Sequence, residues 1–382
     1  MDVLIVGAGV AGLTLAGKLL QQGRSVVLVE QAEAFDEAGY SLGIYPLGSG
    51  VLHGLGAYEE LLERGEVAKT YSVVDAHGDL LQDVDLSSFT GEIGPMVLIT
   101  RTDLVAILLR AAEGADLRMG TTVTAIDHSD AQRVTATFSD GSSGDFDVLV
   151  ACDGLRSRTR ELVFGEEPDA FDTGWLLWAW WAPMPHWDRA VNLESWGTGR
   201  FFGFYPTTDR VMCCVGMPVE SFSAASQDLV VAKAFLRDEF ASFIASDDRV
   251  GTAIDDAERF FEWPMTDARA QEWVKGRVVL CGDSAVGFMP TAGAGANTAM
   301  HCAGSLADEL SKVNGDIVPL GLKLYEKRCR AIVEKNQKDS RKLSRYIFVD
   351  GRAKAWGRDR VMKHYPMAKM IDDIVDAMHT PF

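Results

Sequence analysis

The sequence contains few basic residues relative to acidic ones, with 37 lysines and arginines against 55 aspartates and glutamates, a net charge of −18. Such an excess of negative charge repels phosphate backbones, which argues against nucleic acid as a partner. Long apolar runs are also missing. The longest, GWLLWAWWAPMP at residues 174–185, contains two prolines and is shorter than the roughly 18 residues of a membrane span. We therefore expect no membrane span.

Metal-binding cysteine spacings and histidine clusters are absent as well. The six cysteines show no CxxC spacing and no disulfide framework, so we expect reduced, buried thiols and a cytoplasmic protein. The chain starts almost directly on the apolar run VLIVG, and we expect no signal peptide before it. The histidines His53, His77, His186 and His301 are scattered, so the sequence predicts no metal site and no acid–base constellation.

The 382 residues exceed what one core usually organises, and their pattern predicts a domain inserted into another. Continuous apolar runs, typical of strands covered on both faces, occur near the start, before Asp153 and at residues 277–283. Shorter, aromatic-rich strand patterns fill the stretches between them. We predict an α/β fold with a discontinuous Rossmann-like domain (1–70, 97–170 and 272–350), an inserted β-sheet substrate domain (71–96 and 171–271) and a C-terminal helical tail (351–382).

The glycine-rich segment GAGVAG at residues 7–12 follows a predicted strand and opens a predicted helix. In this context Gly7 permits the tight turn, Gly9 lets a pyrophosphate approach the backbone, and Gly12 lets helix and strand pack closely. The helix N-terminus offers N–H groups and positive dipole to phosphates. Glu30 ends the next strand, at the distance where an acid holds ribose hydroxyls. The pattern predicts dinucleotide binding and leaves FAD and NAD open.

Two further motifs follow buried strands, CDGLRSRTR at residues 152–160 and GDSAVGFMPTAGAGAN at residues 282–297. Parallel strands end at the same sheet edge, so we expect both motifs beside the first loop, where ligands of such folds bind. There Asp283 is placed to accept hydrogen bonds from a polyol and Asp153 to lie near the pyrophosphate. If only one of these aspartates were present, a role as helix N-cap or turn residue would be the preferred explanation.

These motifs resemble those of FAD-dependent monooxygenases of the para-hydroxybenzoate hydroxylase type, over most of the chain to about residue 348. GAGVAG with Glu30 looks like the family's ADP-binding fingerprint, Asp153 to Arg160 like its DG motif, and Gly282–Asp283 with Pro290 like its GD motif. The segment 42–56 is similar to the family's stretch beside the isoalloxazine, and Arg101 stands at its flavin-contacting arginine.

The resemblance implies non-covalent FAD, reduction by NADPH or NADH, and a C4a-hydroperoxyflavin that delivers one oxygen atom of O2 to the substrate. It implies a catalytic role for Pro290, Gly293 and Gly295, which would border the reacting ring. The residues expected to bind the cofactor are Gly7, Gly9, Ala11, Gly12, Glu30, Gly43, Arg101, Asp153, Gly282, Asp283, Gly293, Gly295, Ala296 and Asn297. N–H groups at the 293–297 helix start would stabilise negative charge on the reduced flavin.

The sequence departs from this family at two places. Val286 stands where a histidine is common, and Trp180–Trp181 where Trp-Arg is frequent, which indicates a more apolar substrate surface. Strand periodicity puts Trp178 and Trp180 on one face, and we expect the aromatic set to contact a flat substrate. The predicted substrate pocket consists of Trp178, Trp180, Phe202, Tyr205, Phe288 and Pro290.

The sequence thus predicts an FAD-dependent monooxygenase that uses NAD(P)H and O2 to hydroxylate an aromatic or polycyclic small molecule, as a monomer or homodimer. One alternative is another flavoenzyme on the same fold, since WAWWAP fits the WxWxxP pattern of flavin-dependent halogenases; an oxidase or dehydrogenase belongs to the same class. The other alternative is a non-catalytic paralogue that binds FAD or a ligand.

Overall fold

The computed structural model describes residues 1–35, 40–89, 94–165, 168–222 and 228–364. Its first sheet has six strands in the order β18-β19-β12-β1-β2-β8. All neighbours are parallel except β18, which pairs antiparallel with β19. The strands are β1 (Asp2–Val6), β2 (Ser25–Val29), β8 (Asp116–Arg118), β12 (Val148–Ala151), β18 (Val274–Lys275) and β19 (Val278–Leu280). The apolar runs of β1 and β12 are buried because both faces of this sheet are covered.

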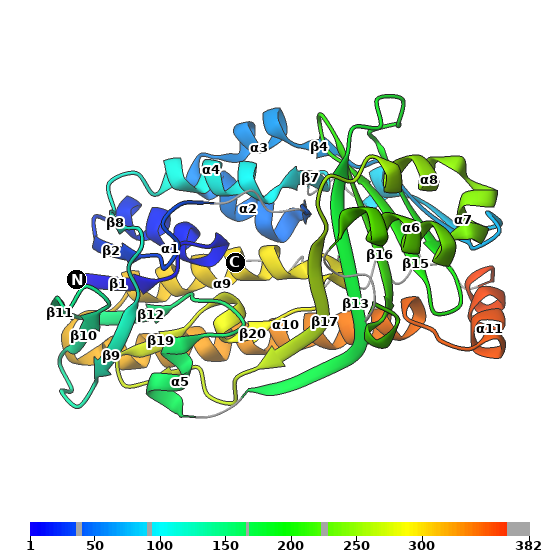
Figure 1. The fold of residues 1–382 in the computed structure, drawn as a ribbon. Helices are drawn as coiled ribbons and strands as arrows, with labels where there is room; N and C mark the ends of the chain where they lie inside the picture. Colours follow the sequence, from blue (N-terminus) through cyan, green and yellow to red (C-terminus); the bar gives the residue numbers. More distant parts are fainter. Residues whose placement is uncertain (36–39, 90–93, 166–167, 223–227, 365–382) are drawn as a thin grey trace.

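Helices cover one face of this sheet and a small sheet covers the other. The helices are α1 (Val10–Gln21), α2 (Pro46–Leu55), α3 (Tyr58–Arg64), α4 (Arg101–Ala111), α9 (Ala294–Ser311) and α10 (Val318–Ile347). Figure 1 shows the long helix α10 beside α9, and α9 packs against both α1 and α10. On the opposite face lie β9 (Val123–Asp127), β10 (Val134–Phe138) and β11 (Ser143–Phe146), whose apolar side chains share a core with Leu4 and Val6. The short helix α5 (Arg158–Phe164) follows β12.

The second large sheet has eight strands in the order β20-β17-β13-β16-β15-β14-β5-β6. Only β14 and β5 pair in parallel. The strands are β5 (Thr70–Asp75), β6 (Leu80–Asp85), β13 (Asp169–Ala182), β14 (Val191–Trp196), β15 (Phe201–Pro206), β16 (Val211–Pro218), β17 (Phe261–Arg269) and β20 (Val286–Gly287). The helices α6 (Leu229–Glu239), α7 (Ala241–Ser246) and α8 (Asp248–Asp255) pack on its outer face (Figure 1).

A three-stranded sheet connects the two halves: β3 (Ser41–Ile44), β7 (Val97–Thr100) and β4 (Glu66–Val67), with β7 in the middle. At the other end, α11 (Arg352–Met362) follows α10. Within the described residues, no helix is both long enough and apolar enough to cross a membrane.

The predicted fold class is confirmed, including the Rossmann-like strand–helix–strand start, the separate β-rich sheet and the C-terminal helices. Segments 71–96 and 171–271 supply seven strands of the eight-stranded sheet, and β20 comes from outside them. The division into two domains remains a prediction. The predicted helical tail at 351–382 contains α11, and its part from residue 365 lies outside the described residues.

Candidate active site

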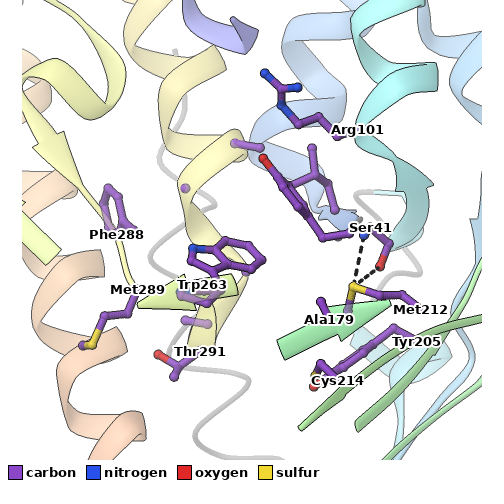
Figure 2. A pocket seen from close by; sticks show the side chains of 18 of the residues that line it. Ser41, Arg101, Ala179, Tyr205, Met212, Cys214, Trp263, Phe288, Met289 and Thr291 are labelled. Atoms are coloured by element: carbon purple, nitrogen blue, oxygen red, sulfur yellow. Dashed lines mark hydrogen bonds between the residues drawn. The ribbon is translucent and has the colours of Figure 1, made fainter. Parts of the chain in front are cut away.

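A cavity of about 440 Å³ lies between the two large sheets. Its wall is formed by the loop after β1, the strand β3, the starts of α4 and α9, the inner face of the eight-stranded sheet and the end of α10. Figure 2 shows Arg101 at one end and Tyr205 and Cys214 at the other, with Trp263 and Phe288 between them. The cavity therefore brings together segments from most of the length of the chain.

The first glycine loop has the geometry that its sequence predicts. A Cβ on Gly7, which has φ +104°, would lie 2.4 Å from the carbonyl oxygen of Cys152. A Cβ on Gly12 would lie 1.9 Å from the carbonyl oxygen of Gly7. Both positions therefore exclude side chains for packing reasons. Gly9 is different, because a Cβ there would meet nothing within 4 Å, and Gly9 lines the cavity together with Val10 and Ala11.

Glu30 follows the end of β2 and reaches back to this loop. Its Oε2 accepts a hydrogen bond from the Ala8 backbone N–H at 2.9 Å, and its Oε1 accepts one from Ala32 at 3.0 Å. The carboxylate thus lies beside the start of α1, where an acid would meet a ribose in this fold. Its contact with a ribose stays a prediction.

The DG-like motif is held by its own helix. Asp153 Oδ1 accepts from the Ser157 hydroxyl, and Oδ2 accepts from the Thr159 backbone N–H at 2.9 Å. This is the turn-residue role that the sequence left open for Asp153, and the carboxylate does not line the cavity, although Cys152 and Gly154 do. Buried Arg160 donates to the carbonyl oxygens of Ser284 and Leu155, both at 2.8 Å, and so joins this motif to the GD-like motif.

The GD-like motif brings Asp283 to the cavity wall. Gly282 adopts φ +70° and a Cβ there would lie 2.8 Å from Cβ of Ala11, so only glycine allows this close approach to α1. The Asp283 side chain is accessible from the cavity, while protein atoms enclose it on its other sides. Burial raises the pKa of Asp283 to about 6 because the charged form loses hydration there.

The N-terminus of α9 points its first turn at the cavity. Gly293, with φ +60°, precedes the helix, and Gly293, Gly295 and Ala296 line the wall. The first N–H groups of a helix have no partner within it and carry partial positive charge, so this turn can stabilise an anion. Pro290, in the short 3₁₀ turn before it, also lines the wall.

Asn297 is buried behind this turn and does not line the cavity. Its Nδ2 donates to the carbonyl oxygens of Gly43 at 2.8 Å and Gly293 at 3.0 Å, and its Oδ1 accepts from the Tyr45 N–H at 2.8 Å. The side chain therefore holds Gly43 and Tyr45, both cavity residues, against the start of α9.

Arg101 and an aromatic pair form the wall near Asp283. Tyr40 and Trp263 have ring centroids 4.6 Å apart, and both line the cavity. Burial raises the pKa of Tyr40, and the neighbouring Arg101 guanidinium opposes that rise. Of these three residues, only Arg101 was predicted from the sequence.

The predicted substrate residues separate into two groups. Tyr205, Phe288 and Pro290 line the cavity. Trp178, Trp180 and Phe202 do not, so that part of the prediction is wrong. They are at most 1% exposed and point to the outer face of the sheet, where they pack under α6, α7 and α8. The period of two was correct, but the cavity side of β13 carries Leu177 and Ala179 instead.

The two departures from the family also lie outside the cavity wall. Val286 is 2% exposed in β20, where it pairs with β17 and packs in the core of the first sheet. Trp181 lies under the Arg210 guanidinium, 4.3 Å from the ring centroid.

Burial lowers the pKa of His301 to about 4, which keeps it neutral. In the described part of the chain, no His, Cys, Asp or Glu cluster is arranged to hold a metal ion.

A buried polar cluster in the cavity wall escaped the sequence analysis. Glu194, 5% exposed, accepts hydrogen bonds from the Tyr205 hydroxyl at 2.5 Å and from Trp196 Nε1 at 2.7 Å. Tyr71, on the neighbouring strand β5, lines the cavity beside this cluster. The available signal was the alternation in VNLESW, which puts Asn192, Glu194 and Trp196 on one face of an otherwise apolar sheet.

This chain is similar to known flavin-dependent enzymes in sequence and in fold. Residues 1–340 match the family model described as FAD binding domain. The chain is 27% identical to a flavin-dependent monooxygenase from an unknown prokaryotic organism, over 88% of this chain and 87% of the relative. It is 30% identical to 2-heptyl-3-hydroxy-4(1H)-quinolone synthase of Pseudomonas aeruginosa strain UCBPP-PA14, over 80% of each chain. A crystal structure of Klebsiella pneumoniae HpxO complexed with FAD and uric acid has the same fold, with TM-score 0.88, 22% identity, and coverage of 99% of this chain and 96% of that one.

Proposed function

The chain belongs to the FAD binding domain family, whose flavin-dependent monooxygenases are its relatives, and from this premise we propose the reaction that it catalyses. The enzyme uses NADPH or NADH and dioxygen to hydroxylate a small aromatic or polycyclic molecule. Relatives named as flavin-dependent monooxygenases and as the synthase of an aromatic quinolone support this assignment.

The observation that carries the proposal is one cavity bordered by parts of all three motifs: Gly9 from the first loop, Gly154 from the second motif, and Asp283 and Gly295 from the third. The residues present fit FAD. Gly9 leaves open space beside the N-terminus of α1, which suits a pyrophosphate. Asp283 offers a carboxylate to polyol hydroxyls, and the first turn of α9 offers N–H groups to an anionic ring edge.

The protein's own contribution is orientation, electrostatics and exclusion of water. The chemistry that bound FAD supplies is acceptance of hydride from NAD(P)H and activation of dioxygen. The positive end of α9 favours negative charge beside Gly295, and Asn297 keeps that turn fixed against Gly43. Phe288, Met212 and Leu177 give the substrate end of the wall apolar surface beside its polar residues, which suits an aromatic ring.

The six cysteines are all buried and free, which supports a reducing, cytoplasmic environment for this enzyme. The family premise leaves a halogenase, an oxidase and a non-catalytic FAD-binding paralogue as alternatives. Each alternative gives a different measurable result. A halogenase forms a halogenated compound, an oxidase forms hydrogen peroxide without oxygenating the product, and a non-catalytic paralogue shows no substrate-stimulated turnover.

The test is a screen of aromatic compounds for stimulated NAD(P)H oxidation by FAD-reconstituted protein, followed by product mass in labelled dioxygen. Incorporation of one labelled oxygen atom is the expected result. Halide-dependent product mass, or NAD(P)H consumption that yields only peroxide with every compound, would contradict the proposal. A preparation that cannot be reconstituted with FAD would contradict the assignment of the cofactor.

A further inference from the structure

In the polar cluster at the substrate end of the cavity, the direction of each hydrogen bond to Glu194 is known. Tyr205 and Trp196 each donate a hydrogen bond to Glu194, and an indole N–H can only donate. Because both groups donate, the ionised carboxylate is the form whose acceptor sites the cluster satisfies. Burial raises the pKa of Glu194, and these hydrogen bonds oppose the rise. Burial, and after it the charge of Glu194, raises the pKa values of Tyr71 and Tyr205, so both phenols keep their protons. Tyr205 donates its proton to Glu194.

These hydrogen bonds leave an acceptor atom in the cavity wall. Once the hydroxyl proton of Tyr205 is engaged with Glu194, the phenolic oxygen of Tyr205 retains lone pairs, and both Tyr71 and Tyr205 line the cavity. Asn192, which also lines it, directs Nδ2 to the carbonyl oxygen of Thr70 at 3.5 Å. Its Oδ1 is buried and has no hydrogen-bond partner among the described residues. The wall thus combines the Glu194 carboxylate with an acceptor on Tyr205.

The backbone is adapted to hold this cluster. Gly203 pairs with Glu194 across β14 and β15, and a Cβ on Gly203 would lie 2.6 Å from Cε2 of Tyr205. The absence of a side chain lets the Tyr205 ring lie across the strand and reach Glu194. Tyr71 pairs directly with Asn192 on the other side of β14. In the described part of the chain, no arginine or lysine forms an ion pair with Glu194, so its charge is not neutralised locally.

We propose that the cluster of Glu194, Tyr71, Tyr205 and Asn192 is a specificity site that selects uncharged aromatic substrates carrying an O–H or N–H donor and rejects aromatic carboxylates. The inference deepens the proposed function, because it names the substrate class of the same cavity. A donor on the substrate satisfies the phenolic oxygen of Tyr205, whereas a second carboxylate meets the charge of Glu194, which no ion pair within the described ranges compensates.

The test uses three matched probes: β-naphthol, its methyl ether, which lacks the donor, and a hydroxynaphthoate with a carboxylate on the far ring. Affinities are measured by ligand-observed NMR titration of the FAD-reconstituted protein. We expect β-naphthol to bind about tenfold or more tightly than its methyl ether, the effect of one hydrogen bond to a charged cluster. We expect the hydroxynaphthoate to bind most weakly.

Glu194→Gln keeps the side-chain shape and removes the charge. It should reduce the preference for β-naphthol and increase hydroxynaphthoate affinity, a reversal that a merely structural role would not produce. Tyr205→Phe, a second variant in case Glu194→Gln fails to fold, should lower only β-naphthol affinity. Glu262→Gln, an exposed glutamate on β17, is the matched control and should retain the native order.

Three results would overturn the inference: no β-naphthol binding, hydroxynaphthoate binding as tight as β-naphthol binding in the native protein, or unchanged affinities in Glu194→Gln. FAD titration of the same preparations distinguishes this failure from failure of the proposed function. A protein that binds FAD but prefers carboxylates retains its family chemistry and lacks this specificity site.

Discussion

Asn297 Oδ1 accepts a hydrogen bond from the backbone N–H of Tyr45 at 2.8 Å, between residues 252 positions apart in the chain. The same side chain donates to Gly43 and Gly293, so three backbone groups in two segments around the cavity depend on one buried amide. Asn297 was predicted to contact the cofactor; in the structure it supports residues that line the cavity instead.

Asn297→Ala should destabilise the protein by about 1–3 kcal/mol, because buried backbone groups lose their partners. It should also weaken FAD binding by loosening the start of α9. Urea denaturation and FAD titration measure the two effects. Asn297→Asp retains the acceptor for Tyr45 but loses both donors, so we expect a similar or larger loss. Native stability in Asn297→Ala would show that the amide contributes no net support.

The glycines of the first loop allow packing and cofactor approach to be separated. Gly12→Ala should lower the stability of the FAD-free protein, since its Cβ would lie 1.9 Å from a backbone oxygen. Gly9→Ala has open space around its Cβ and φ −78°, so it should fold normally and still lose FAD affinity. Thermal melting without FAD and titration with FAD provide the comparison. Equal FAD affinity in native protein and Gly9→Ala would contradict the assignment of Gly9 to the pyrophosphate.

These local features explain why the nucleotide-binding part of the fold was predictable. The turn at Gly7, the close approach at Gly12 and the position of Glu30 follow from residues within one strand–helix–strand unit. The position of Asp283 could be predicted for a similar reason, since the ends of parallel strands meet at one sheet edge. Asp153 satisfied the same pattern, yet its carboxylate is used within its own turn.

The substrate end was less predictable because it depends on which face of the second sheet is inward. Strand alternation groups Trp178 with Trp180 but does not say which face meets the cavity. Trp178 and Trp180 lie on the outer face because the apolar side chains of α6, α7 and α8 pack against that face. Glu194 was missed because its neighbours Tyr71 and Tyr205 come from separate strands whose pairing the sequence does not reveal.

Asp283→Asn should change the pH dependence of stability in the FAD-free protein. Its pKa is about 6 in the folded state, against 3.8 as the reference value, so between about pH 4 and 6 the native state holds a proton that the unfolded state has lost. The native protein therefore loses stability from this group as pH rises through that range. The variant lacks this loss, and its stability relative to the native protein should rise from about pH 4 to 6 and then stay constant.

Chemical denaturation of both proteins across this range measures the difference. Solvent in the cavity reduces the size of the effect, so the sign is the decisive quantity. A difference that is independent of pH would show that Asp283 titrates normally. FAD affinity should fall in Asp283→Ala, and an unchanged affinity would indicate a turn residue only.

Trp180→Ala should act on stability and leave ligand selection unchanged in the protein that remains folded. Trp180 is fully buried, donates from Nε1 to the carbonyl oxygen of Ala253 at 2.7 Å, and packs on Phe202. Its loss should cost about 3–5 kcal/mol. Ala179→Val, one residue away on the cavity face, is the matched variant and should alter the affinity of aromatic ligands with little effect on stability. Denaturation and β-naphthol titration of both variants test this division, and altered ligand preference in Trp180→Ala with native stability would show that the tryptophan faces the substrate after all.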